Sequence, residues 1–186
     1  WDTRVDGEKP QRERSVTTLD GVPYVHVPGA ALSATPLDRY LQVAADAFVR
    51  EARLARPELI QAASNHLTAL PALIAARRLG VPFVYEVRGL WEVTEASGKE
   101  GWEESERYRF AVELETLLAR EADAVLAITP EVAAVLEQRG VARERISVAP
   151  NAVDPAVFAP LPRDAAYAES RQVRTDVPVI GFAGSM

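Results

Sequence analysis

Short apolar runs alternate with amphipathic stretches of helical length along most of this chain, and this alternation limits the folds that it can adopt. Between residues 36 and 56, apolar side chains recur at the spacing of one helix face, at Leu37, Tyr40, Leu41, Ala44, Ala45 and Phe48. A short apolar run follows at residues 59–63 and reads as a buried strand. Strands separated by helices of this length are typical of a parallel sheet with right-handed crossovers. The predicted fold class is α/β, with a parallel sheet flanked by helices.

The same pattern predicts the remaining elements. The expected strands cover residues 22–27, 59–63, 82–87, 123–128 and 145–149, and the expected helices cover residues 36–56, 67–79, 103–122 and 129–139.

Local signals place some of the helix ends. Thr129, Pro130 and Glu131 supply an N-cap, a proline at the first position and an acid in the first turn, all of which favour a helix start. Pro71 fits best near a first turn, so the second helix is expected to begin at about residues 68–70. The helix at 103–122 is expected to bury four side chains: Phe110, Leu114, Leu117 and Leu118.

Two segments lack a regular period. Residues 88–101 contain three glycines and form the longest loop expected after a strand, and loops of that length are usually functional or disordered. Residues 155–178 contain four prolines, and residues 155–176 are interpreted as an interdomain linker. We expect an N-terminal domain at residues 1–154, and in residues 177–186 the first strand of a second domain. A strand without a covering helix at the end of the chain predicts that the sequence is a fragment of something larger.

Composition excludes several classes of function. The 186 residues carry a net charge of −6, which argues against a protein that mainly binds nucleic acid. There is no cysteine and there are only two histidines, so no disulfide, thiolate metal site or histidine cluster is expected. No apolar run is long enough to span a bilayer, and no signal peptide is visible. The chain is expected to be cytoplasmic, with the inner face of the membrane as an alternative location.

Candidate site residues follow from the position of the loops. In open α/β sheets, ligands bind beyond the carboxyl ends of the strands. Arg88 beside Trp91 and Glu92 is a combination that can hold a polar ligand and stack on a sugar ring. The predicted catalytic residue is Arg88, and the predicted substrate-binding residues are Asn65, His66, Gly89, Trp91, Glu92, Thr129 and Asn151.

Four sequence blocks then resemble glycosyltransferase family 4. They are "VPFVYEVRGLWE", "READAVLAITPEV", "RGVARERISVAPNAVDPAVFAP" and "VPVIGFAGS", in this order and at this spacing. The resemblance covers roughly residues 57–186 and is closest to members with a "YEVRxxWE" loop, some of which are associated with exopolysaccharide synthesis.

The resemblance implies a retaining GT-B enzyme, in which two Rossmann-like domains face each other. The N-terminal domain would hold a glycan or lipid-linked acceptor, and the second domain a nucleotide-sugar. Such enzymes generally need no metal, because helix N-termini and basic side chains neutralise the diphosphate. No cofactor is therefore expected, and the fragment alone is expected to be inactive.

The sequence departs from the family pattern at several positions. Arg88 stands where many members have a histidine, so charge rather than proton transfer is expected there. Asn151 is followed by Ala152 instead of glycine. The glycine-rich loop near the family's N-terminus and the basic pair and paired glutamates of its second domain are missing.

Structural alternatives remain open for each candidate. Arg88 could pair with Glu86 or Glu92, His66 and Thr129 could cap helices, and Trp91 could fill the loop. The arginines Arg50, Arg53 and Arg56 are interpreted as a solvated helix face, with peripheral contact to anionic lipid as the alternative. A two-domain sugar-nucleotide epimerase and a standalone non-catalytic α/β binding domain are the alternative functions.

Overall fold

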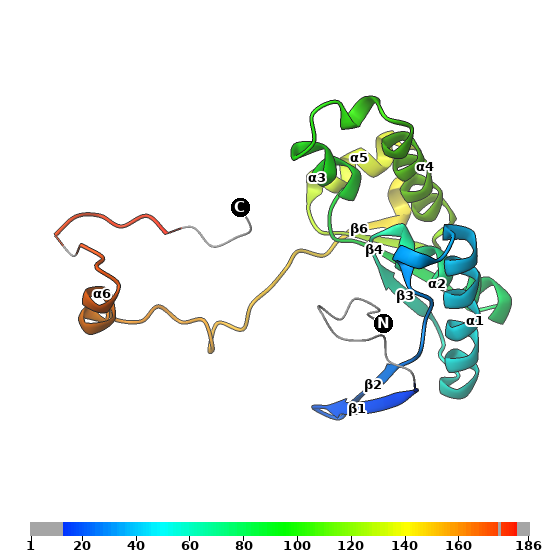
Figure 1. The fold of residues 1–186 in the computed structure, drawn as a ribbon, viewed down its shortest axis with the longest axis horizontal. Helices are drawn as coiled ribbons and strands as arrows, with labels where there is room; N and C mark the ends of the chain where they lie inside the picture. Colours follow the sequence, from blue (N-terminus) through cyan, green and yellow to red (C-terminus); the bar gives the residue numbers. More distant parts are fainter. Residues whose placement is uncertain (1–12, 175, 182–186) are drawn as a thin grey trace. The chain divides into compact units, whose positions relative to one another are not determined.

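Four parallel strands form the centre of the chain in the computed structural model, which describes residues 13–174 and 176–181 (Figure 1). The strands lie side by side in chain order: β3 (Ile60–Ala63), β4 (Phe83–Val87), β5 (Ala124–Ala127) and β6 (Ile146–Val148). Every neighbouring pair is parallel. The α/β fold and the parallel sheet predicted from the sequence are confirmed.

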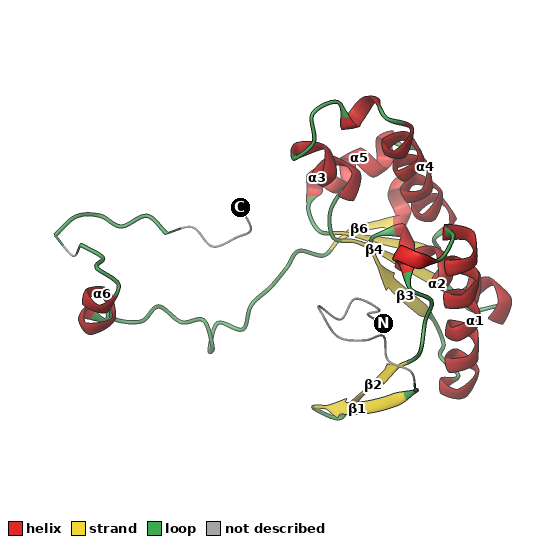
Figure 2. Cartoon of the chain, viewed as in Figure 1, coloured by secondary structure: helices red, strands yellow, loops and turns green. Residues whose placement is uncertain are grey.

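Helices connect and flank these strands (Figure 2). The long ones are α1 (Leu37–Ala55), α2 (His66–Leu79), α4 (Glu106–Glu121) and α5 (Pro130–Gln138). Because the strands follow one another in chain order, right-handed crossovers place α2, α4 and α5 on the same face of the sheet. Alternating burial along β4 agrees with this arrangement: Phe83, Tyr85 and Val87 are buried, whereas Val84 and Glu86 on the other face are half-buried. The core lies between β3–β6 and these helices.

A hairpin precedes the sheet. Strands β1 (Ser15–Leu19) and β2 (Val22–His26) pair antiparallel. Asp20 and Gly21 join them with φ values of 50° and 79°, as the tightest hairpin turns require. The strand predicted at residues 22–27 is confirmed as β2, whereas β1 was not predicted.

Helix α2 begins earlier than Pro71 suggested. Asn65 is its N-cap, and the Asn65 side chain accepts a hydrogen bond from the Leu67 N–H at 3.2 Å. Pro71 lies inside the helix and is buried, so packing against the core outweighs the hydrogen bond that proline cannot donate. The predicted start at residues 68–70 was wrong for this reason.

Short helices occupy the two segments that lacked a period. Within residues 88–101 the chain forms α3 (Trp91–Ser97), and the 3-10 turn η2 (Trp102–Glu104) follows it. Helix α6 (Ala165–Ser170) lies inside the predicted linker and is capped by the Asp164 side chain, which accepts from the Tyr167 N–H at 2.9 Å. Helices this short carry too few residues to show a hydrophobic period. The remaining 3-10 turns are η1 (Leu32–Ala34) and η3 (Arg143–Arg145).

Helix α4 turns a different face inward from the one expected. Leu118 and Glu115 are buried, whereas Phe110 and Leu117 are 48% and 45% exposed. Phe110 and Leu117 are seven residues apart and therefore share one stripe of the helix, which points away from the sheet. The prediction was correct for Leu118 and wrong for these two side chains.

The chain divides into two compact units, Trp1–Asn151 and Ala152–Met186. The first contains both sheets, and α6 lies in the second. Residues 177–181 are not paired into a sheet among the described residues, and residues 182–186 lie outside them. The strand and the domain boundaries expected in this region stay predictions.

None of the helices within residues 13–174 and 176–181 is long and apolar enough to cross a membrane.

Gly140→Ala is expected to lower the free energy of unfolding by about 1–2 kcal/mol, as measured by urea denaturation. Gly140 has a φ of +85°, which an L-amino acid with a side chain adopts only under strain. An added Cβ would also lie 2.7 Å from Arg120 Nη2. Gly98→Ala is the matched control, since Gly98 has a φ of −107° and nothing lies within 4 Å of its added Cβ. Equal stability of the two variants would contradict the prediction.

Candidate functional site

The loops that follow β3 and β4 meet at Ser64. The Ser64 hydroxyl accepts a hydrogen bond from the Arg88 backbone N–H at 3.1 Å and another from the Trp91 indole N–H at 3.2 Å. Neighbouring parallel strands end at the same edge of a sheet, so the loops that follow them come together there. The hydroxyl thereby joins the Arg88–Trp91 segment to the segment that carries Asn65 and His66.

The Arg88 side chain is exposed and paired on one side. Its Nε donates to Glu86 Oε1 at 2.7 Å, and the side chain is 61% exposed. Gln61 donates to the other oxygen of the same carboxyl at 2.8 Å. The Arg88 hydrogen bond lowers the pKa of Glu86 and raises that of Arg88. The ion pair with Glu86 that the sequence left open is therefore formed. It uses only one edge of the Arg88 guanidinium group.

Trp91 begins helix α3 and is 40% exposed, with its indole N–H held by Ser64. A half-exposed indole whose polar end is fixed offers a ring face for a sugar to stack on. Gly89 lies between Arg88 and Trp91, and a Cβ added there would meet nothing within 4 Å. Packing within the described chain therefore does not require glycine at position 89.

His66 lies over a buried carboxyl group. Glu115 of α4 is 5% exposed, and its Oε1 is 2.7 Å from the His66 backbone nitrogen and 3.0 Å from His66 Nδ1. The Tyr85 hydroxyl donates to Glu115 Oε2. Burial raises the pKa of Tyr85 well above its ordinary value, and the neighbouring Glu115 adds to that shift. The contact ties α2, β4 and α4 together directly beneath the candidate site.

Glu92 points inward and not toward the loop surface. It is 2% exposed, and its Oε1 lies 2.6 Å from Arg139 Nη2 at the end of α5. Glu92 is thus placed where it anchors α3 to α5. Its predicted contact with substrate stays a prediction.

Thr129 and Asn151 lie at the ends of β5 and β6. The Thr129 hydroxyl accepts from the Val132 N–H at 3.3 Å and caps α5, as its sequence signal indicated. Asn151 is exposed and ends the first unit. Among the described residues, no hydrogen bond or ion pair links either residue to the Ser64 group, that is, Ser64 with Arg88 and Trp91.

Several residues of this region were not predicted as site residues. Ser64 directly follows β3, at the end of a strand where ligand-binding loops are expected. A serine at such a position gives no signal, however, that two loops will converge on its hydroxyl. Glu115 and Arg139 lie far in sequence from the Arg88 and His66 loops. Tyr85 is only three residues before Arg88, but its side chain is buried in the core. The one available signal was Glu115 itself, a charged residue between Leu114 and Leu118 on the predicted inner face of α4.

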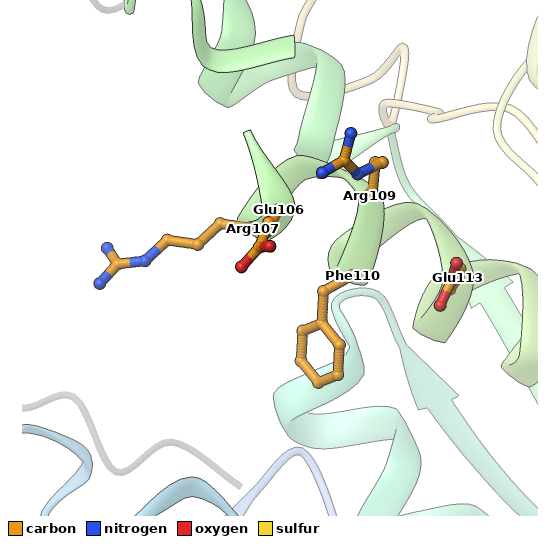
Figure 3. A pocket seen from close by; sticks show the side chains of 5 residues that line it. All are labelled: Glu106, Arg107, Arg109, Phe110 and Glu113. Carbon is orange, nitrogen blue, oxygen red and sulfur yellow. The ribbon is translucent and has the colours of Figure 1, made fainter. Parts of the chain in front are cut away.

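Two hollows lie apart from the predicted residues. One, of about 490 Å³, runs along the first turns of α4 and is lined by Glu106, Arg107, Arg109, Phe110 and Glu113 (Figure 3). The other, of about 620 Å³, is lined by residues of α1, α2, β2 and β3. Neither is lined by a residue predicted to act on substrate.

Solved structures share this fold. The chain is similar to Anabaena Alr3699/HepE in complex with UDP-glucose, with a TM-score of 0.54 and 20% identity over 74% of this chain and 34% of that one. HepE in complex with UDP gives a TM-score of 0.52 at the same identity and coverage. The S. aureus MnaA–UDP structure is more distant, with a TM-score of 0.47 and 18% identity over 61% of this chain and 28% of that one. The chain therefore spans about a third of the length of these proteins.

A search of the curated proteins found no match to the sequence. A profile described as a glycosyl transferase 4-like domain, by contrast, matches residues 3–152 and so includes the whole sheet and the Ser64 group. Because that match extends over most of the sequence, and the sheet has the fold of part of HepE, this chain belongs to the family of glycosyl transferase 4-like domains.

Proposed function

We propose that this chain is the acceptor-side domain of a retaining glycosyltransferase. The enzyme would transfer a sugar from a nucleotide-sugar to a glycan or lipid-linked acceptor, in the synthesis of a polysaccharide or glycoconjugate. The observation that carries the proposal is the Ser64 group, which joins the backbone of Arg88 and the half-exposed indole of Trp91 where β3 and β4 end. The exposed Arg88 side chain extends from the same segment.

The chemistry of these side chains suits a sugar substrate. The ring of Trp91 offers an apolar face for a pyranose, while polar groups beside it can bind hydroxyls. The edge of Arg88 that Glu86 leaves unused can donate two parallel hydrogen bonds to two oxygens of an anionic group. Arg88 would thereby stabilise negative charge at the reacting centre without a metal ion.

The donor would be held outside the residues described above. HepE, which shares the fold, is named as a complex with UDP-glucose and with UDP, and this supports a nucleotide-sugar as the donor. We propose that residues 177–186 begin the domain that binds it, that residues 155–176 form the linker, and that the chain is inactive without that domain. Asn65, His66, Gly89, Glu92, Thr129 and Asn151 are proposed to contribute to substrate binding, Glu92 through its hold on α3.

Arg88→Ala is expected to lower the transfer rate at least tenfold, corresponding to the loss of about 1.4 kcal/mol of transition-state stabilisation. The assay uses a polypeptide that contains this chain together with a nucleotide-sugar-binding half. Its measure is kcat/KM for radiolabelled sugar transfer. The Arg88–Glu86 pair is exposed, so stability should change by no more than about 1 kcal/mol.

Arg53→Ala is the matched control, since Arg53 is an exposed arginine in the last turn of α1. Arg88→Lys should fall between wild type and Arg88→Ala, because lysine keeps the charge and loses the planar fork. Wild-type turnover in Arg88→Ala would remove Arg88 from the mechanism.

A further inference from the structure

The Glu115 carboxyl group is buried beneath the candidate site and holds the ring of His66. The carboxyl oxygen Oε1 accepts the His66 backbone N–H at 2.7 Å and lies 3.0 Å from His66 Nδ1. The Glu115 side chain is 6% exposed and that of His66 is 17% exposed. A buried hydrogen bond of this kind is strengthened by its low-dielectric surroundings.

This geometry selects one tautomer of the imidazole. Since Oε1 already accepts the backbone N–H, it acts as an acceptor toward Nδ1 as well, and Nδ1 carries the hydrogen. In the neutral ring, Nε2 then holds a lone pair. Among residues 13–174 and 176–181, no hydrogen bond to Nε2 is present, so this nitrogen is available to a ligand.

The same carboxyl group makes this position unsuitable for an anion. Helix N-termini usually attract phosphates through their unpaired N–H groups. At α2 these groups are already paired: Glu115 accepts from His66, and Asn65 accepts from Leu67, Thr68 and Ala69. A phosphate placed here would find the N–H groups of residues 66–69 already paired and would face a carboxyl group.

We propose that Glu115 and Tyr85 are positioning residues that hold His66 with the lone pair of Nε2 directed to a ligand. Nε2 then accepts a hydrogen bond from a hydroxyl group of a neutral sugar substrate. The same arrangement disfavours binding of a phosphate or carboxylate. The inference rests on the proposed function and assigns the chemistry of one part of its site. Tyr85 acts through Glu115, because its hydroxyl occupies Oε2 and leaves Oε1 for His66. The exposed guanidinium of Arg88 remains for any negative charge in the site.

The tautomer of His66 can be read by long-range ¹H–¹⁵N NMR of the 186-residue chain. The sequence has only two histidines, and His26 is exposed in β2, which makes it an internal reference. The expected result is a lone pair on Nε2 of His66 and a hydrogen on its Nδ1, unlike His26. A hydrogen on His66 Nε2 in the neutral ring would overturn the proposal, whatever the activity of the protein.

Titration with small sugars tests the ligand class. Methyl glycosides of glucose, galactose, mannose and N-acetylglucosamine are compared with glucose 1-phosphate and glucose 6-phosphate. At least one neutral glycoside should shift the His66 Nε2 signal, and the phosphates should shift it less. A larger response to phosphate, or no response to any glycoside, would contradict the hydroxyl assignment.

Glu115→Leu is expected to bring the tautomer of His66 toward that of His26 and to weaken the glycoside response roughly fivefold, the equivalent of one hydrogen bond. Glu115→Gln keeps one acceptor oxygen and should restore part of both. Glu113→Leu, at an exposed position of the same helix, is the matched control. If Glu115→Leu does not fold, the comparison of wild type with Glu115→Gln decides, with a weaker glycoside response expected in the variant.

A wild-type response in the folded Glu115 variants would remove Glu115 as a positioning residue. The tautomer is measured without a sugar donor or any turnover. Failure of this inference is therefore distinguishable from failure of the proposed glycosyl transfer, which the Arg88 variants test.

Discussion

Arg139→Ala is expected to lower the free energy of unfolding by about 3–5 kcal/mol, because it leaves a buried carboxyl group without its ionic partner. The Glu92 side chain is completely buried, and that of Arg139 is 16% exposed. Neither carboxyl oxygen of Glu92 has a hydrogen-bond partner among the described residues, so the contact of 2.6 Å with Arg139 Nη2 is its main compensation. Urea denaturation followed by circular dichroism measures the loss.

Arg143→Ala is the matched control for that variant. Arg143 also forms an ion pair, with Glu137 at 3.0 Å, but its side chain is 63% exposed. Exposed pairs contribute about 0–1 kcal/mol, so the control should remain close to wild type. If the two arginine variants lose similar stability, burial of the Glu92–Arg139 pair is not what stabilises this region.

Replacing both partners separates the cost of an unpaired charge from the value of the pair. The double variant Glu92→Met and Arg139→Met removes both charges and keeps most of the volume. Replacing a buried ion pair in this way often leaves the stability unchanged or raises it, so the double variant is expected to recover most of the stability lost in Arg139→Ala.

The pair also anchors α3, whose first residue is Trp91, so Arg139→Ala should increase hydrogen exchange at residues 91–97.

The sequence predicted the elements whose signal is local. The strand predicted at residues 82–87 forms as β4 (Phe83–Val87), and the Thr129 cap with Pro130 set the start of α5 correctly. Both signals come from residues next to one another in the chain. The predicted start of α2 was wrong because two signals competed there. The cap by Asn65 and the hydrogen bond from the His66 N–H to Glu115 set the start of the helix, and Pro71 does not.

Parts of the candidate site depend on contacts that no local pattern encodes. Glu115 is 49 residues from His66 in sequence, and its burial depends on how α4 rotates against the sheet. A helical wheel of α4 alone favours Phe110 and Leu117 as inner residues, yet both are exposed. The strand-end rule located the Arg88 and His66 loops, whereas the hydrogen-bonded groups beneath them follow from tertiary packing.

Alkaline pH is expected to destabilise this fold through Tyr85. Burial raises the pKa of Tyr85 above its ordinary value of 10.0, with the charge of Glu115 and the hydrogen bond to it adding to the shift. The folded state therefore keeps the phenol proton at a pH where the unfolded chain releases it. The stability that this provides is fully present below about pH 10 and is lost as the pH rises toward the pKa of the folded state, by about 1.4 kcal/mol per pH unit.

The measurement is urea denaturation of wild type and of Tyr85→Phe between pH 8 and pH 12. At pH 8 the variant is expected to be less stable by about 1–3 kcal/mol, because Glu115 Oε2 loses its donor while remaining buried. Above pH 10 this difference should shrink and then reverse, because phenylalanine has no proton to release. Tyr167→Phe removes a phenol that is 60% exposed and should keep a constant difference from wild type. If the Tyr85→Phe difference is also constant with pH, the phenol of Tyr85 ionises in the folded protein as readily as in the unfolded chain. The buried contact that positions Glu115 beneath His66 would then be absent in solution.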